Sequence, residues 1–183
     1  MPYILLLITS LMMAGSVFAA SSTASAMSSL TAAMNQRMLD MKEVASYKAT
    51  HHLPVEDRVR EEKVLSLAQK QAEEAQLDPA SVMPFIQAQM DVAKAIQYRY
   101  FADWLSQPGS ATPSRSLEEV RTSISVQDKR ILEAIAQRLL AGGFSGEDRA
   151  EIATLLHAPH LTDADKARLT DALVLIRRSS KAA

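Results

Sequence analysis

The chain has 183 residues, a formal net charge of −1 at pH 7 and no cysteine. The near-neutral charge argues against a broad basic surface for nucleic acid, and the lack of cysteine excludes disulfides, thiolate metal sites and cysteine nucleophiles. Five glycines and 5% aromatic residues are too few for a typical β-sandwich or β-barrel. Nine methionines, together with many alanines and leucines, instead indicate an all-α fold.

The first twenty residues contain an uncharged, mostly apolar stretch that ends in the letters VFA, the small-x-small pattern that signal peptidase cleaves. The stretch is too short to span a membrane comfortably. We therefore expect a signal peptide over residues 1–20, cleavage after Ala19 or Ala20, and no stable membrane association afterwards. The alternative is a buried or membrane-anchoring helix. The exported mature chain, 21–183, is expected to be a single domain, and its Ser-, Ala- and Thr-rich residues 21–29 suggest a flexible start.

About six helices follow. They are expected over residues 30–50, 55–75, 78–105, 116–141, 145–158 and 162–177. The first ends before Pro54, because the residue before a proline avoids the α region. The second places Glu56 and Asp57 in its first turn, where the helix dipole favours acids. The fourth begins with Ser116 and Glu119 in the spacing of a capping box.

Cations interrupt the apolar faces of these helices. At 100° per residue, Arg37 and Lys48 share one stripe of the first helix with Leu30, Met34, Met41 and Val44. They lie about 16 Å apart along the axis, so both side chains can reach a point between them. Arg60 in the second helix and Arg121 in the fourth lie on apolar stripes in the same way. Gln97 is the polar member of the stripe of the third helix.

A single Lys or Arg on such a stripe usually extends to the edge of the core and keeps its charge in water, and a buried Gln usually bonds to the backbone. However, each buried unpaired cation costs several kcal/mol, and the inward faces offer few carboxylates, of which Asp128 is one. We therefore assign the missing anions to a ligand. The pattern predicts a polar pocket inside a helical bundle that binds a small molecule with more than one carboxylate.

The order and spacing of these residues resemble the all-α chorismate mutases. The resemblance rests on Arg37 and Lys48 eleven residues apart, LPVEDRVR at 53–60, AIQYRYFADW at 95–104, Arg121-x-x-Ile124, and RIL at 130–132. Three of these features fit in particular the secreted, periplasmic gamma subclass: the stretch at 95–104, the motif at 121–124 and the motif at 130–132. The expected signal peptide fits that subclass as well. The match covers about residues 30–135, which are then the catalytic helices. Residues 140–180 match only in being helical.

The resemblance implies a role for each matching position. Arg37, Arg60 and Arg121 correspond to cations around the substrate carboxylates, Lys48 and Gln97 to the donors to the ether oxygen, and Asp57 and Glu61 to positions near the ring hydroxyl. Ala93 stands where the family often has a Ser or Thr that contacts a carboxylate. That contact is then lost, or made by the backbone or water.

The implied reaction is the conversion of chorismate to prephenate, a step of aromatic amino acid biosynthesis, here in the periplasm. It needs no cofactor and no metal, and the histidines at 51, 52, 157 and 160 lack a third ligand at a suitable spacing. The resemblance also implies an active site within one chain, and a homodimer. Two alternatives remain: an inactive exported helical binding protein for a small dicarboxylate, which Ala93 favours, and a helical adaptor or chaperone, against which the inward cations count.

Overall fold

The computed structural model describes residues 14–107 and 109–180. Its helices, in chain order, are α1 (Ala14–Thr50), α2 (Arg58–Glu74), α3 (Pro79–Ser106), α4 (Leu117–Leu140), α5 (Gly146–Leu155) and α6 (Asp163–Leu173). Within these residues the predicted all-α class and the six helices are confirmed, with one isolated bridge between Leu77 and Arg178. In the same part of the chain, no helix combines the length and the apolar character that crossing a membrane requires.

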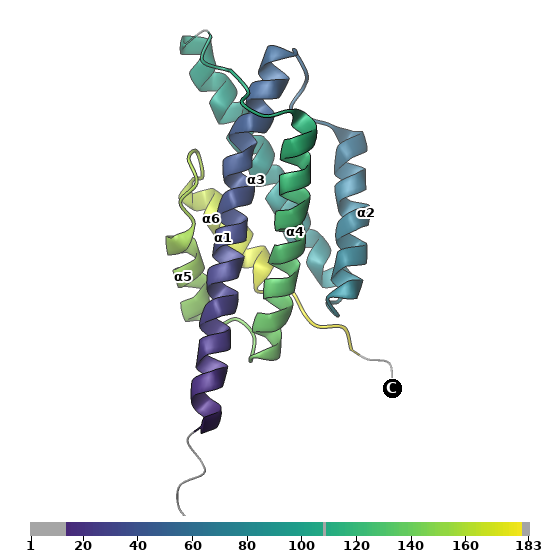
Figure 1. Cartoon of the computed structure of the whole chain (residues 1–183), viewed down its shortest axis with the longest axis vertical. Coiled ribbons are helices and arrows are strands. Elements are labelled where there is room, and N and C mark those ends of the chain that lie inside the picture. The colour runs from purple at the N-terminus through teal and green to yellow at the C-terminus, as the bar shows by residue number, and fades with distance from the viewer. Residues whose placement is uncertain (1–13, 108, 181–183) are drawn as a thin grey trace, which may run out of the picture.

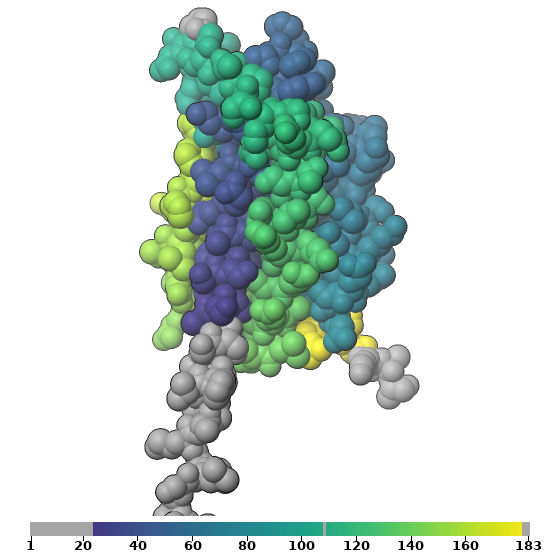
Figure 2. Space-filling model, in the orientation of Figure 1, coloured from purple at the N-terminus to yellow at the C-terminus, as the bar shows by residue number. Residues whose placement is uncertain are grey.

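The three longest helices form the centre of the bundle (Figure 1). α1 packs along α4 and also against α3, while α2 covers α3 and α4 on one side. On the opposite side, α6 packs against α3, and α5 packs against α6 and α1. Figure 2 shows α1 and α4 side by side across one face, between α2 and the C-terminal helices. The core between them is apolar and includes several fully buried side chains: Leu30, Met34, Met38, Phe85, Ile96, Ile131 and Leu132.

Local capping explains where α3 begins and where α4 begins and ends. The Asp78 side chain accepts a hydrogen bond from the backbone N–H of Ala80, at the start of α3. Ser116 and Glu119 form both bonds of the predicted capping box at the start of α4. α4 ends where Gly142 takes a φ of +119°, a conformation that side-chain-bearing residues rarely adopt. These predicted boundaries are confirmed.

The start of α1 differs from the prediction. Residues 21–29 are helical and belong to α1, so the expected flexible start is wrong. Ala26 and Met27 are buried against the core, which continues the apolar stripe of α1 toward the N-terminus. That burial outweighs the low helix propensity of the neighbouring serines. Of the predicted signal peptide, residues 1–13 lie outside the described residues.

Three further boundaries were placed wrongly. α5 ends at Leu155 rather than just before Pro159. α2 begins at Arg58 rather than near residue 55, and Asp57 is its N-cap instead of a member of its first turn, with Glu56 before the helix. α6 ends at Leu173 rather than near residue 177. The backbone that follows α6 bonds to the turn between α2 and α3: the N–H of Asp78 donates to the carbonyl of Arg177 at 2.9 Å.

Candidate active site

A cavity of about 100 Å³ lies between α1, α2, α3 and α4. This volume is several times what one buried water requires, so a small organic molecule can enter. All eight site residues predicted from the sequence line it: Arg37, Lys48, Asp57, Arg60, Glu61, Ala93, Gln97 and Arg121. Apolar side chains complete the wall: Met41, Val44, Val55, Val64, Met90 and Ile124. Residues far apart in the sequence thus converge on one pocket, whose wall combines charged and apolar side chains.

Arg37 is held in the wall of the cavity by two acceptors. Its Nε donates to Oδ1 of Asp128 on α4 at 2.6 Å, and its Nη1 donates to the backbone carbonyl of Gln89 on α3 at 3.3 Å. The Arg37 side chain is only 4% exposed. A buried guanidinium of this kind is tolerated because it is paired and hydrogen-bonded.

Lys48 reaches the cavity from the last turns of α1, where it is buried. Its Nζ donates to the backbone carbonyl of Val55 at 2.5 Å. Burial lowers the pKa of Lys48 below the ordinary value of 10.5, and the nearby Asp57 carboxylate offsets this only in part. Lys48 forms no ion pair with any described residue.

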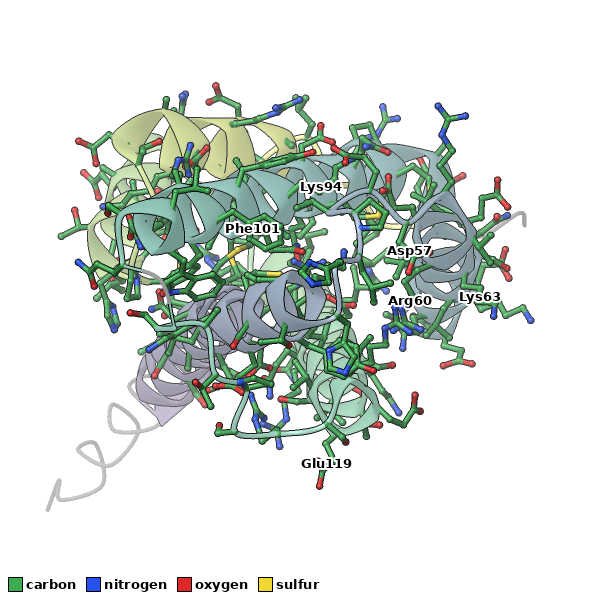
Figure 3. The ribbon with its side chains drawn as sticks, turned by 90° about the horizontal axis from the view of Figure 1, so that it is seen from above. Asp57, Arg60, Lys63, Lys94, Phe101 and Glu119 are labelled. Atoms are coloured by element: carbon green, nitrogen blue, oxygen red, sulfur yellow. The ribbon has the colours of Figure 1, made fainter. Side chains whose placement is uncertain are left out.

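Asp57 joins the start of α2 to α4. Its Oδ1 accepts from the N–H of Arg60 as the N-cap of α2, and its Oδ2 accepts from Arg121 at 2.9 Å. Figure 3 shows Asp57 and Arg60 on the side of α2 that faces the other helices, whereas Lys63 extends outward. Arg60 forms no ion pair within the part of the chain that the structure describes.

Lys94 on α3 also lines the cavity, and the sequence reasoning missed it. Its Nζ lies 3.1 Å from Oε2 of Glu61 and 3.6 Å from Oδ1 of Asp91. Burial alone would lower the pKa of Lys94, but the hydrogen bond and the charge of Glu61 outweigh it and raise that pKa. The available signal was its position three residues before Gln97, at the edge of the same helix face.

Gln97 places its amide in the cavity wall. Its Nε2 donates to the backbone carbonyl of Ala93 at 3.1 Å and contacts Sδ of Met41 at 3.7 Å. Its Oε1 is buried without a hydrogen-bond partner among the described residues. Ala93 supplies no hydroxyl here, so its contribution to this wall is a methyl group and the carbonyl that orients Gln97.

The charges around the cavity do not balance. In residues 14–107 and 109–180 its lining carries five cations, of which three are paired: Arg37 with Asp128, Arg121 with Asp57, and Lys94 with Glu61. Lys48 and Arg60 remain, so the site has an excess of two positive charges and suits a ligand with two carboxylates. No group of three or more His, Asp or Glu residues in these ranges is arranged to hold a metal ion.

Comparison with known proteins identifies the family of the chain. Residues 28–98 match the family model for chorismate mutase type II. The chain is 47% identical over 176 residues to a monofunctional chorismate mutase of Enterobacter agglomerans, covering 96% of this chain and 97% of that protein. It is 44% identical over 133 residues to a secreted chorismate mutase of Yersinia pestis, covering 72% of each.

Solved structures show the same relationship. The crystal structure of secreted chorismate mutase from Yersinia pestis has a TM-score of 0.76 at 38% identity, and the match covers 82% of this chain and 97% of that one. The chorismate mutase of Burkholderia phymatum shares the fold, with a TM-score of 0.69 at 22% identity over 83% of this chain and 98% of that one. The chain therefore belongs to the type II chorismate mutase family.

Proposed function

We propose that the protein is a chorismate mutase that rearranges chorismate to prephenate. The observation that carries this proposal is the excess of two positive charges in the cavity between α1, α2, α3 and α4, left by Lys48 and Arg60 after the other cations are paired. Chorismate carries two carboxylates, which balance that excess. The relatives named above bear the name of the enzyme, and none of them supports the alternative of an inactive binding protein.

The reaction is an intramolecular Claisen rearrangement, so it requires no nucleophile and no proton transfer. The substrate must fold into a compact conformer in which the two reacting carbons meet. Arg37, Arg60 and Arg121 approach the cavity from three different helices and can hold both carboxylates of that conformer. Such orientation removes much of the entropy cost of reaching the transition state.

Negative charge grows on the ether oxygen as its bond to carbon breaks. We assign the stabilisation of this charge to Lys48 and Gln97, one a cation and the other a neutral donor, both of which are buried. The bond from Gln97 to the Ala93 carbonyl orients the amide. Its second N–H faces the Met41 sulfur, a weak acceptor that an ether oxygen can replace.

Asp57 and Glu61 are assigned to the surroundings of the ring hydroxyl. Both line the cavity at the start of α2, and the backbone N–H of Asp57 also approaches Oε1 of Glu61 at 3.4 Å. Each oxygen of these two carboxylates already accepts one hydrogen bond. A carboxylate has about four acceptor sites, so each still has lone pairs for a hydroxyl. In this assignment the two residues orient the ring and leave the bond changes to Lys48 and Gln97.

Export and assembly complete the proposal. Relatives named secreted chorismate mutase and the apolar N-terminal segment support a signal peptide and a periplasmic enzyme. The resemblance to the gamma subclass supports a homodimer in which each chain carries a whole site. Sequencing the N-terminus of the protein from periplasmic extracts tests the cleavage site, and light scattering coupled to gel filtration tests the dimer.

The activity is tested by incubating the purified protein with chorismate and following the loss of its absorbance, with prephenate identified as the product. We expect turnover that disappears on heat denaturation and is strongly reduced in Lys48→Ala. A folded protein that binds chorismate without converting it would contradict the proposal and restore the inactive binding protein.

A further inference from the structure

Arg37 faces the cavity, but the carboxylate that pairs with it does not. Asp128 is absent from the lining of that cavity and lies behind Arg37, on α4. It borders a second, smaller cavity of about 20 Å³, which it shares with Arg60, Gln71 and Ser125. Asp128 therefore does not contact a ligand in the larger cavity, and any effect on that ligand passes through another residue.

The contact between Asp128 and Arg37 determines how Arg37 points. A guanidinium is planar, and here two of its three nitrogens are bound, one to the Asp128 carboxylate and one to the Gln89 carbonyl. Two anchors on different nitrogens define the plane and leave the remaining N–H groups for the cavity. Without Asp128, Arg37 would have one backbone acceptor at 3.3 Å and the freedom to turn about it.

We infer that Asp128 is a positioning residue for substrate binding, acting through Arg37. This inference rests on the proposed function, because it assigns a role in binding the substrate carboxylate. Since Arg37 holds a carboxylate that is present in the substrate and in the transition state alike, loss of its orientation weakens both. The effect of changing Asp128 is then seen mainly in KM and less in kcat.

The chain offers a matched control for a purely structural ion pair. Arg138 on α4 and Asp148 on α5 pair at 2.7 Å with comparable burial, and neither lines the larger cavity. Asp148→Asn and Asp128→Asn each replace a paired carboxylate by an amide of nearly the same shape. Both variants are expected to lower the melting temperature, and only Asp128→Asn is expected to change substrate binding.

The experiment is a double-mutant cycle in kcat/KM with chorismate. Asp128→Asn is expected to lower kcat/KM by about 10-fold, chiefly through KM, because the neutral amide oxygen is a weaker acceptor for Arg37 than the carboxylate and no longer balances its charge. In an Arg37→Ala background the same change is expected to have less than about a threefold effect, because Asp128 then has no cation to orient. Binding of prephenate, measured by calorimetry, gives the same cycle where turnover is too slow.

The outcomes separate the two proposals. If the wild-type protein turns over chorismate and the effects of Asp128→Asn and Arg37→Ala multiply, Asp128 does not act through Arg37 and the inference is overturned. An Asp128→Asn variant with unchanged KM and a lower melting temperature, like Asp148→Asn, also overturns it. If the folded wild-type protein has no activity, the proposed function fails instead, and the cycle in prephenate affinity still tests the orientation of Arg37.

Discussion

Lys48 donates its hydrogen bond to the backbone carbonyl of Val55, across the turn that follows α1. Both residues are buried and both line the cavity. The acceptor is neutral, so the position of the ammonium group is defined while its charge is not cancelled. The protein thus holds a buried cation whose charge is available to a ligand.

This arrangement separates the catalytic effect of Lys48 from its effect on stability. For Lys48→Ala we expect kcat to fall by about a hundredfold, as for the loss of one donor to a developing oxyanion. The free energy of unfolding should stay the same or rise, because a buried unpaired cation is removed. The measurements are chorismate turnover and thermal unfolding, with the exposed Lys129→Ala as control. An unfolded Lys48→Ala protein would show that Lys48 is structural.

The lowered pKa of Lys48 predicts an alkaline limit to activity. Because kcat/KM reports the free enzyme, it should decrease at a pH below 10.5, as Lys48 loses its proton. Bound carboxylates raise this pKa, so the decrease in kcat should occur at higher pH. The unfolded chain holds the proton more tightly than the folded one, so stability should increase with pH over the same interval. Profiles of both parameters from pH 6 to 10.5 test this. A decrease of kcat and of kcat/KM over the same pH range would contradict it.

The neutral amide of Gln97 predicts that kcat does not depend on pH on the acid side of its pH profile. An amide donates at any pH, so kcat should be constant from about pH 5 to pH 8, where the reference titrations of Lys and Arg do not fall. In Gln97→Glu only the protonated carboxyl can donate, so activity should move to acid pH and fall as the carboxyl ionises. Paired pH–rate profiles test this. Identical flat profiles would remove Gln97 from the ether-oxygen site and leave it a core amide.

Ala93 leaves a position without a hydroxyl in the cavity wall, beside the amide of Gln97. If the cavity holds a carboxylate nearby, Ala93→Ser adds one hydrogen bond, worth about 1 kcal/mol, or about a fivefold lower KM. The control is Ala95→Ser on the same helix, since Ala95 does not line the cavity. Steady-state kinetics of both variants give the answer. Equal KM values for wild type and Ala93→Ser would show that no substrate group lies within reach.

The early start of α1 predicts a stability effect at the N-terminus. Met27 is 5% exposed and packs in the core, so Met27→Ala should lower the free energy of unfolding by about 2 kcal/mol or more. The exposed Ser29→Ala serves as control. Denaturant titration measures both. A Met27→Ala protein as stable as the wild type would mean that the first turns of α1 contribute nothing to the fold in solution.

Much of the site could be predicted because its residues break a regular pattern. A cation on an apolar stripe is visible in the sequence alone, and helix periodicity then places Arg37, Lys48 and Arg121 toward one interior. Capping residues mark helix boundaries equally well, since Ser116 and Glu119 satisfy free backbone groups wherever they occur. Family resemblance added the assignment of Ala93, which no pattern indicates.

Other features depend on tertiary packing and could not be predicted. The position of Lys94 near Gln97 places it only at the edge of an inward face, and its pairing with Glu61 on α2, which directs it to the cavity, is not visible in the sequence. The helix over residues 21–29 has many serines, and it forms because Ala26 and Met27 find a core to bury in. The sequence marks Asp128 as an inward carboxylate. It does not show that Asp128 is the residue that pairs with Arg37.

Arg37 and Lys48 belong to one continuous helix of 37 residues, α1, which packs on both α3 and α4. Their separation of about 16 Å along the axis is therefore set by backbone hydrogen bonds and cannot change while α1 is intact. A ligand finds the two charges already in place and adjusts only side-chain torsions. Activity on heating should consequently persist until the helical signal itself is lost, with no inactive folded state at intermediate temperature.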